Sequence, residues 1–345
     1  MKKLLLLTII SVLLFTLSAC QFGNTAEDDN VITVYSERHY ETDRDLFDKF
    51  EEETGIRVNL VRDGADQLIT KLENEGEDSP ADLLIIADAG RLHRAKTKDL
   101  LQPVSSELLE ENVPSNYRDV DGTWFGLTKR ARVIVYHPDR VDASELSTYE
   151  ALTDEKWEGR IVVRTSANIY NQSLMASFVE VMGEAGARNF AEGLVQNFAR
   201  TPQGNDRDQA KALLEGVADI AIMNTYYMGL LKYSADAYER EVADTLEVFF
   251  PNQDTTGTHV NVSAAGVTKH APNKEGAIAL LEFLTSEEAQ SVYANANYEY
   301  PVNESVEPHE YLASLGSFKA QDISLSLLGV NQALATTIMD EEGWE

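Results

Sequence analysis

The chain has 345 residues, of which 43% are apolar and 25% are charged, so it can bury a sizeable hydrophobic core. This composition excludes an intrinsically disordered protein and a collagen-like or low-complexity one. The 58 acidic residues outnumber the 29 basic ones, and the net charge of −29 argues against binding to nucleic acid. The only cysteine, Cys20, excludes an intrachain disulfide, an iron–sulfur cluster and a cysteine-based zinc site. We therefore expect the ligand to be a cation or a neutral molecule, unless a local pocket reverses the overall field.

The N-terminal segment has the pattern of a secretory signal. Two lysines precede an uncharged run over residues 4–17, which is too short for a membrane span of about 20 residues. The run leads into Leu-Ser-Ala-Cys, ending at Cys20, which resembles the bacterial lipobox, where the cysteine is lipidated and becomes the new N-terminus. We predict a signal peptide over residues 1–19 and a lipidated, polar tether over residues 20–30, which holds the protein on the extracytoplasmic side of a bacterial membrane. An ordinary secretory signal cut nearby is the alternative.

Strand-like and helix-like segments alternate along the rest of the chain. A β-rich run over 31–35 precedes helical spacing over 42–53, and a strand over 56–61 precedes a helix over 65–74 and a buried strand over 81–86. This βαβαβ order predicts an open α/β sheet with helices on both faces, and the lack of a Pro/Gly-rich linker favours two lobes joined by crossing strands. The later elements are expected over 160–164, 171–182, 220–223, 228–234, 257–267, 275–285 and 287–295.

Tyrosines gather where predicted strands lead into predicted helices. Ligands of an open α/β sheet bind beyond the carboxyl ends of its strands, and the positive end of the following helix favours an ionised phenolate. A single tyrosine at such a place is usually a packing residue whose hydroxyl bonds to the backbone. Several in equivalent positions, one of them beside His39, indicate a ligand site instead. The tyrosines in question are Tyr40, Tyr170, Tyr226 and Tyr227.

Phenolates restrict the chemistry of the expected ligand. The pKa of phenol lies near about 10, so only a strong Lewis acid displaces its proton at neutral pH. Ferric iron fits this requirement, whereas calcium and magnesium prefer carboxylate and carbonyl oxygens. The adjacent Tyr226 and Tyr227 would point in opposite directions on an extended segment, so both reach one ion only if the backbone turns there.

Several segments, in order along the chain, resemble the bacterial ferric-iron ABC-transporter substrate-binding proteins. The resemblance runs from about Val31 to about Gln332 and includes the Ser-Glu-Arg-His-Tyr sequence that ends at Tyr40. The other matching segments are 156–160, 164–173, 204–209, 224–227, 257–262 and 297–301.

The resemblance implies the type II periplasmic-binding-protein fold, in which two lobes close on the metal as a hinged clamp. Each lobe is then an open, mostly parallel sheet flanked by helices, and hinge strands cross between the lobes. The N-terminal lobe would comprise residues 31–128 plus about 258–298, and the C-terminal lobe residues 129–257 plus about 299–345. Tyr40 would come from the first lobe and the other three tyrosines from the second.

The resemblance leaves part of the metal's coordination open. His39 occupies a position that is a ligand in some relatives and not in others. The branch with His-Tyr and three further tyrosines binds iron with protein groups alone, whereas other members borrow carbonate or phosphate, so a synergistic anion remains open here. Many relatives carry Arg where this chain has Leu230, which removes one positive charge near the metal.

Charge balance predicts cations around the site. Four phenolates on Fe³⁺ leave a net charge of −1, and burying that charge requires nearby cations or donors. Arg132, in the expected crossing strand, and Arg164, before the helix of Tyr170, are the candidates. Each could instead form a structural ion pair elsewhere.

We thus predict a lipid-anchored, monomeric iron(III)-binding protein that is not an enzyme and delivers ferric iron to an ABC permease. One alternative is a protein of the same fold that binds a small organic or oxyanion ligand, with the tyrosines stacking on it. Another is an extracytoplasmic hydrolase, for which no nucleophile and base are found. The run Asp206-Arg207-Asp208 is expected to cap a helix, and His259 to be structural.

Overall fold

The computed structural model describes residues 30–345. The predicted signal peptide, its cleavage site and the lipidation residue Cys20 lie outside the described residues. Within residues 30–345, no helix is both long enough and apolar enough to cross a membrane.

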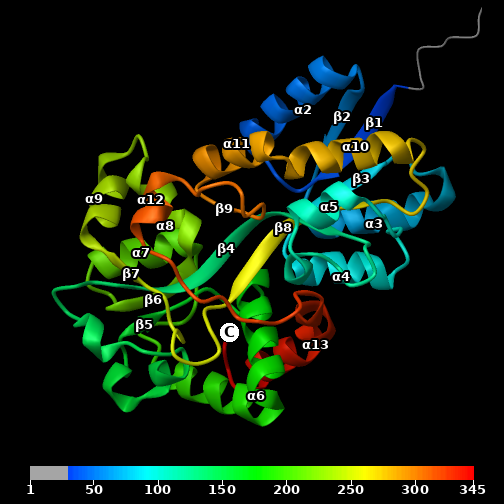
Figure 1. The fold of residues 1–345 in the computed structure, drawn as a ribbon. Helices are drawn as coiled ribbons and strands as arrows, with labels where there is room; N and C mark the ends of the chain where they lie inside the picture. Colours follow the sequence, from blue (N-terminus) through cyan, green and yellow to red (C-terminus); the bar gives the residue numbers. More distant parts are fainter. Residues whose placement is uncertain (1–29) are drawn as a thin grey trace, which may run out of the picture.

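Two α/β lobes lie side by side and share a pair of long strands (Figure 1). The strand order is β2-β1-β3-β8-β4-β6-β5, and β7 and β9 also pair with β4. The strands are β1 (Val31–Ser36), β2 (Arg57–Arg62), β3 (Leu83–Ala87), β4 (Phe125–Tyr136), β5 (Ile161–Val162), β6 (Ile220–Asn224), β7 (Glu247–Phe249), β8 (Val260–Val267) and β9 (Tyr300–Pro301).

Strand β4 belongs to both lobes. Its first part, up to Ala131, pairs antiparallel with β8 in the N-terminal lobe, and the part from Arg132 to Tyr136 pairs antiparallel with β6 in the C-terminal lobe. The outer strands of each sheet run parallel: β1 with β2 and β3, and β5 with β6. The two-lobed α/β fold with crossing strands agrees with the sequence-based prediction.

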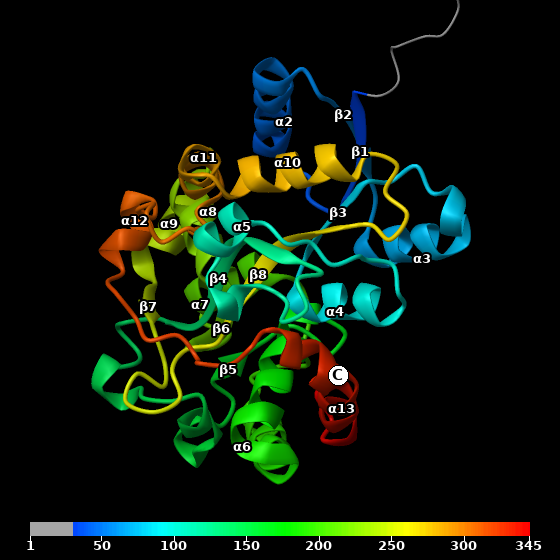
Figure 2. The ribbon, with the colours of Figure 1, turned by 45° about the vertical axis from the view of Figure 1, so that its right-hand side comes forward.

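Helices cover the sheets, as Figures 1 and 2 show. In the N-terminal lobe they are α2 (Glu41–Thr54), α3 (Ala65–Glu75), α4 (Ala89–Thr97), α5 (Glu107–Asn112), α10 (Lys274–Thr285) and α11 (Glu287–Asn297). In the C-terminal lobe they are α6 (Ile169–Gln196), α7 (Asp206–Leu214), α8 (Thr225–Lys232), α9 (Ala237–Thr245), α12 (Glu310–Ser314) and α13 (Ser326–Glu341). Short 3₁₀ turns are η1 (Gly76–Asp78), η2 (Ser115–Tyr117), η3 (Ala143–Glu145), η4 (Glu150–Thr153) and η5 (Glu155–Trp157).

Local sequence explains where the helices begin, bend and end. Helix α2 buries Leu46, Phe47 and Phe50 at helical spacing, and Gly55 ends it with φ 71°, a left-handed conformation that favours glycine. Helix α6 is kinked at Gly183, whose φ of 74° is not helical. The C-terminal α13 packs against α6 and also against α4 of the other lobe (Figure 2).

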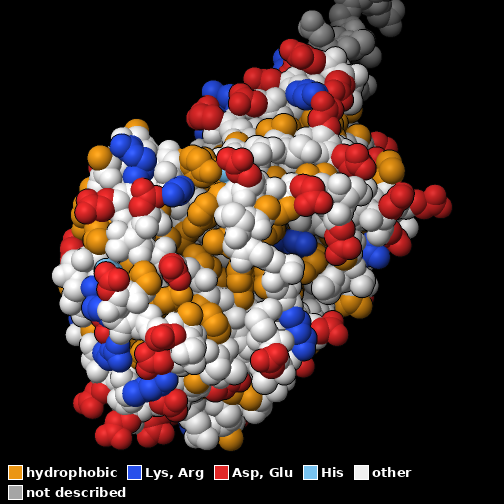
Figure 3. Space-filling view, turned by 60° about the vertical axis from the view of Figure 1, so that its left-hand side comes forward, with side chains coloured by type: hydrophobic (Ala, Val, Ile, Leu, Met, Phe, Trp, Pro, Cys, Tyr) orange, Lys and Arg blue, Asp and Glu red, His pale blue; other side chains and the backbone are white. Residues whose placement is uncertain are grey.

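The molecular surface is strongly acidic. Figure 3 shows acidic side chains spread over both lobes on one face, with hydrophobic side chains gathered in the hollow between the lobes. This distribution fits the net charge of −29. Such a surface attracts cations and repels anions.

Candidate metal site

A pocket of about 440 Å³ brings together all five predicted metal-binding residues. Leu230 also lines it, so the position at which many relatives carry Arg faces this pocket. The lining residues are Glu37, Arg38, His39, Tyr40, Ala87, Arg130, Tyr170, Arg207, Tyr226, Tyr227, Leu230, Ser263 and Glu299.

The loop between β1 and α2 presents His39 and Tyr40. Tyr40 is the N-cap residue of α2 but makes no side-chain capping bond, so its hydroxyl is left for the pocket. The two rings stack with centroids 5.1 Å apart. Beneath them the buried Arg38 lies 5.1 Å from the Tyr40 ring centroid and pairs with Asp43 at 3.1 Å and Glu299 at 3.3 Å. These ion pairs hold the loop in place.

Tyr170 and Tyr226 approach each other from the starts of two helices. Tyr170 is the second residue of α6, and the N-cap Asn168 accepts a hydrogen bond from its backbone N–H at 3.2 Å. The hydroxyl oxygens of Tyr170 and Tyr226 lie 3.5 Å apart. This separation is short enough for one ion to contact both oxygens.

The tyrosine pair lies inside a helix, which corrects the predicted start of that helix. Helix α8 begins at Thr225 rather than at Met228, so Tyr226 and Tyr227 form part of its first turn. The two rings stack with centroids 4.1 Å apart, and both line the pocket. No additional backbone turn is needed, because neighbouring residues of a helix do not point in opposite directions as they do on a strand.

Burial raises the pKa of the pocket tyrosines. It raises the pKa of Tyr227 to about 12, where the charge of neighbouring Tyr170 adds to the effect. Burial also raises the pKa of Tyr226 and Tyr40 well above the usual value, and neighbouring acidic groups add to this. The expectation that helix N-termini would favour phenolates is therefore overruled by burial in these three residues. Without a cation, their phenols are neutral at pH 7.

The two arginines predicted to balance the metal's charge share one partner. Arg132 lies 2.8 Å and Arg164 2.9 Å from the fully buried carboxylate of Asp206. Their guanidinium carbons lie 6.0 and 5.6 Å from the ring centroid of Tyr170. From the sequence, each arginine could either balance the charge of the metal site or form a structural ion pair. In the structure both arginines do the two together, since each pairs with Asp206 and also lies beside Tyr170, a predicted ligand. Together the three groups carry one positive charge.

The acidic residues in the first turn of α7 have two different roles. Asn205 is the N-cap of α7, and Asp208 completes a capping box by accepting a hydrogen bond from the Asn205 N–H at 2.8 Å. The predicted capping role is confirmed for Asp208. It is wrong for Asp206, whose carboxylate faces the two arginines instead.

Arg130 is a pocket residue that the sequence did not single out. It is 2% exposed, lies 5.0 Å from the Tyr170 ring centroid and donates to Ser263 Oγ at 3.3 Å. Its Nε and Nη2 have no hydrogen-bond partner among the described residues. Because Arg130 and Arg132 alternate with smaller residues on one strand, they point to the same side, and this spacing is the signal that could have revealed it. A buried donor without a partner indicates a negatively charged group in front of it.

Other metal chemistry finds no support in residues 30–345, where no three His, Cys, Asp or Glu side chains gather around a common point. His259 is 2% exposed, with Nδ1 3.3 Å from Gln321 Oε1, and is not among the residues that line the pocket. The pocket is therefore a site built from tyrosine oxygens and surrounding guanidinium groups.

A two-lobed α/β clamp with a polar pocket between its lobes defines a solute-binding protein. The family of bacterial extracellular solute-binding proteins matches residues 35–291, and the chain belongs to this family. Iron uptake protein A1 of Synechocystis sp. is 51% identical over 94% of this chain and 90% of its own length. The major ferric iron-binding protein of Neisseria meningitidis is 27% identical over 90% of this chain and 92% of its own. The solved structure of Trichodesmium FutA with iron and citrate ligands is similar with a TM-score of 0.89 and 48% identity, over 91% of this chain and all of that one (100%).

Proposed function

We propose that this protein binds ferric iron between its lobes and delivers it to an ABC permease, without catalysing a reaction. One observation carries the proposal: tyrosine hydroxyls from both lobes line a single pocket, and two of them, those of Tyr170 and Tyr226, lie 3.5 Å apart. Phenolate oxygens select a hard trivalent cation over calcium or magnesium. The names of the similar proteins point to the same ion.

In this proposal Tyr40, Tyr170, Tyr226 and Tyr227 bind the ion as phenolates, and His39 supplies a fifth group. The surrounding charges support such a set. Arg130 contributes one positive charge, and the group formed by two arginines and Asp206 contributes another. These charges offset the negative charge that four phenolates leave on Fe³⁺, so its burial is less costly.

Iron capture closes the two lobes on each other. We place the lobes at residues 31–128 plus about 258–298 and 129–257 plus about 299–345, and the change of β4 partner between Ala131 and Arg132 supports a crossing near the first of these boundaries. Because the ion joins groups from both lobes, it binds the closed form better and shifts the population toward it. The permease then recognises the closed, loaded protein. Reduction to Fe²⁺ or protonation of the phenolates releases the ion.

An anion accompanies the iron in this proposal. The unpartnered Nε and Nη2 of the buried Arg130 face the pocket region and suit a carboxylate or carbonate oxygen. Citrate, which accompanies iron in the Trichodesmium structure, is one such group. If Arg130 binds the anion, Arg130→Gln should abolish the dependence of iron affinity on added carbonate or citrate. An unchanged dependence would contradict this role.

The iron assignment is tested by a visible spectrum and metal analysis of the purified protein. The iron-loaded protein should be coloured by a phenolate-to-metal charge-transfer band and should contain one iron per chain. Tyr227→Phe should shift or abolish the band and weaken binding. Tyr238→Phe is the matched control, because this tyrosine is 37% exposed and its hydroxyl donates to Glu215 away from the pocket. A colourless protein, or a band unaffected by Tyr227→Phe, would contradict the proposal.

The membrane attachment is tested separately. We propose that Cys20 is lipidated after removal of residues 1–19 and that the protein is a monomer on the extracytoplasmic side. Cys20→Ser should then move the protein from the membrane fraction to the soluble fraction. Its recovery in the membrane fraction would contradict the anchor but would not affect the iron assignment.

A further inference from the structure

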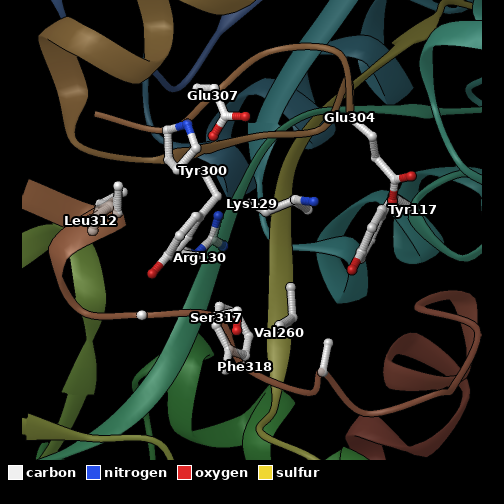
Figure 4. A pocket seen from close by; sticks show the side chains of 14 residues that line it. Tyr117, Lys129, Arg130, Val260, Tyr300, Glu304, Glu307, Leu312, Ser317 and Phe318 are labelled. Carbon is white, nitrogen blue, oxygen red and sulfur yellow. The ribbon is translucent and has the colours of Figure 1, made fainter. Parts of the chain in front are cut away.

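A second cavity, of about 490 Å³, lies beside the crossing strands (Figure 4). Lys129 and Arg130 are neighbours on β4, so their side chains leave the strand on opposite faces. Arg130 turns to Tyr170 and Ser263 of the tyrosine pocket, whereas the Lys129 ammonium lies 4.7 Å from the ring centroid of Tyr117 in the second cavity. Arg130 lines both cavities, but the two lists of lining residues share no other member, so the second cavity adjoins the proposed iron site without containing its tyrosines.

One end of this cavity holds an unsatisfied cation. Lys129 makes no hydrogen bond or ion pair within the described part of the chain, and its ammonium group contacts the Tyr117 ring. Burial lowers the pKa of Lys129, and Glu304 opposes this only in part. A partly buried ammonium group without a carboxylate at ion-pair distance is a binding point for a ligand carboxylate.

The opposite end combines apolar side chains with Arg130 and contains a second unsatisfied group. Tyr300 is 9% exposed, and its hydroxyl has no hydrogen-bond partner among residues 30–345. Figure 4 shows Tyr300, Arg130 and Leu312 to the left of Lys129, with Phe318 below Tyr300. This end suits an apolar or aromatic group, because rings and aliphatic side chains can stack on it.

Two exposed carboxylates also line the cavity. Glu304 stands near Tyr117, and the Glu307 carboxylate is turned toward the middle of the cavity (Figure 4). Both side chains are exposed and neither forms an ion pair within the described residues. A simple anion would be repelled by these two carboxylates and a simple cation by Lys129. A molecule that carries both charges is complementary to the whole arrangement.

We propose that this cavity binds a small zwitterion of the amino-acid type with an apolar or aromatic side chain. Its carboxylate contacts Lys129, its ammonium group contacts Glu307, and its side chain lies against Tyr300 and Phe318. The cavity volume is within the range of about 300–1,000 Å³ that is usual for small-molecule sites. The site does not depend on the proposed iron function.

The test uses L-phenylalanine as the probe and the metal-free mature protein, with titration calorimetry as the measurement. Two analogues isolate the charges: 3-phenylpropionate lacks the ammonium group and 2-phenylethylamine lacks the carboxylate. We expect saturable binding of L-phenylalanine and at least about tenfold weaker binding of each analogue. Absence of saturable L-phenylalanine binding, or equal binding of either analogue, would overturn the proposal.

Variants locate the binding. Lys129→Met and Glu307→Gln should each weaken L-phenylalanine binding at least about tenfold. Lys269→Met is the matched control, since this lysine pairs with Asp99 on the surface, and should leave it unchanged. Tyr227→Phe should also leave it unchanged, so failure of the iron proposal would not affect this result. Binding that persists in both Lys129→Met and Glu307→Gln would place the ligand elsewhere and refute the site.

Discussion

Replacing Asp206 by Asn should strongly destabilise the metal-free protein. The carboxylate is fully buried and lies 2.8 Å from Arg132 and 2.9 Å from Arg164. An asparagine can accept a hydrogen bond from one guanidinium group but leaves both without a counter-charge. Removing one partner of a buried ion pair costs about 3–5 kcal/mol, so we expect the free energy of unfolding to fall by that amount.

The assay is urea unfolding at neutral pH, followed by circular dichroism, with Asp208→Asn as the control. Asp208 lies on the same helix and carries the same charge, but its carboxylate only completes the capping box. Its replacement should cost about 1 kcal/mol. If Asp206→Asn costs no more than this, the buried ion pairs do not hold the C-terminal half of the site together.

Iron makes a second, independent measurement possible. In Asp206→Asn, the two arginines leave a surplus of positive charge beside Tyr170. The negative charge of iron-bound phenolates would offset this surplus. Iron loading should therefore reduce the difference in stability between Asp206→Asn and the unaltered protein. A difference that stays the same with iron would show that these arginines do not interact with the metal-bound tyrosines.

Three further predictions follow from burial and packing. Because burial raises the pKa of Tyr226 and Tyr227, iron binding should release protons, and competition with a chelator other than citrate should show iron affinity falling about tenfold for each unit by which the pH is lowered, per proton released. Burial lowers the pKa of His259 to about 3. The unfolded chain binds a proton there below about pH 6.5, so stability should fall from that pH toward pH 3 by up to about 1.4 kcal/mol per unit, and His259→Gln should lack this slope in urea titrations. A Cβ on Gly229 would lie 2.6 Å from Tyr298, so Gly229→Ala should cost about 1–3 kcal/mol of unfolding free energy; unchanged stability would contradict the packing.

The sequence predicted that the four tyrosines would meet at one pocket, because they follow a rule of local order. Each tyrosine stands after a strand and at or near a helix start, and in a parallel arrangement such points meet at one edge. The start of α8 was placed too late because Thr225 and the two tyrosines are weak helix formers, and the N-cap Asn224 makes no side-chain capping bond. In that case tertiary packing decided the boundary.

The partners of the charged residues could not be predicted in the same way. Asp206 meets Arg132 across 74 positions of the chain, and this pairing depends on how α7 packs against β6, the strand that pairs with β4. The sequence around Asp206 resembles a helix cap, and Asp208 does complete a capping box there. Arg130 escaped notice for a related reason, since burial of a cation without a partner appears only once the lobes are assembled.

The sharing of β4 between the two sheets has a mechanical consequence. The strand changes partners beyond Ala131, next to the residues that face the two cavities. In the closure proposed above, rotation of one lobe against the other twists the backbone there, beside Arg130, which lines both cavities. If that closure changes the affinity of the second cavity, thermodynamic linkage requires a ligand bound there to change the affinity for iron by the same factor. Strand β4 would in this way couple the two cavities energetically.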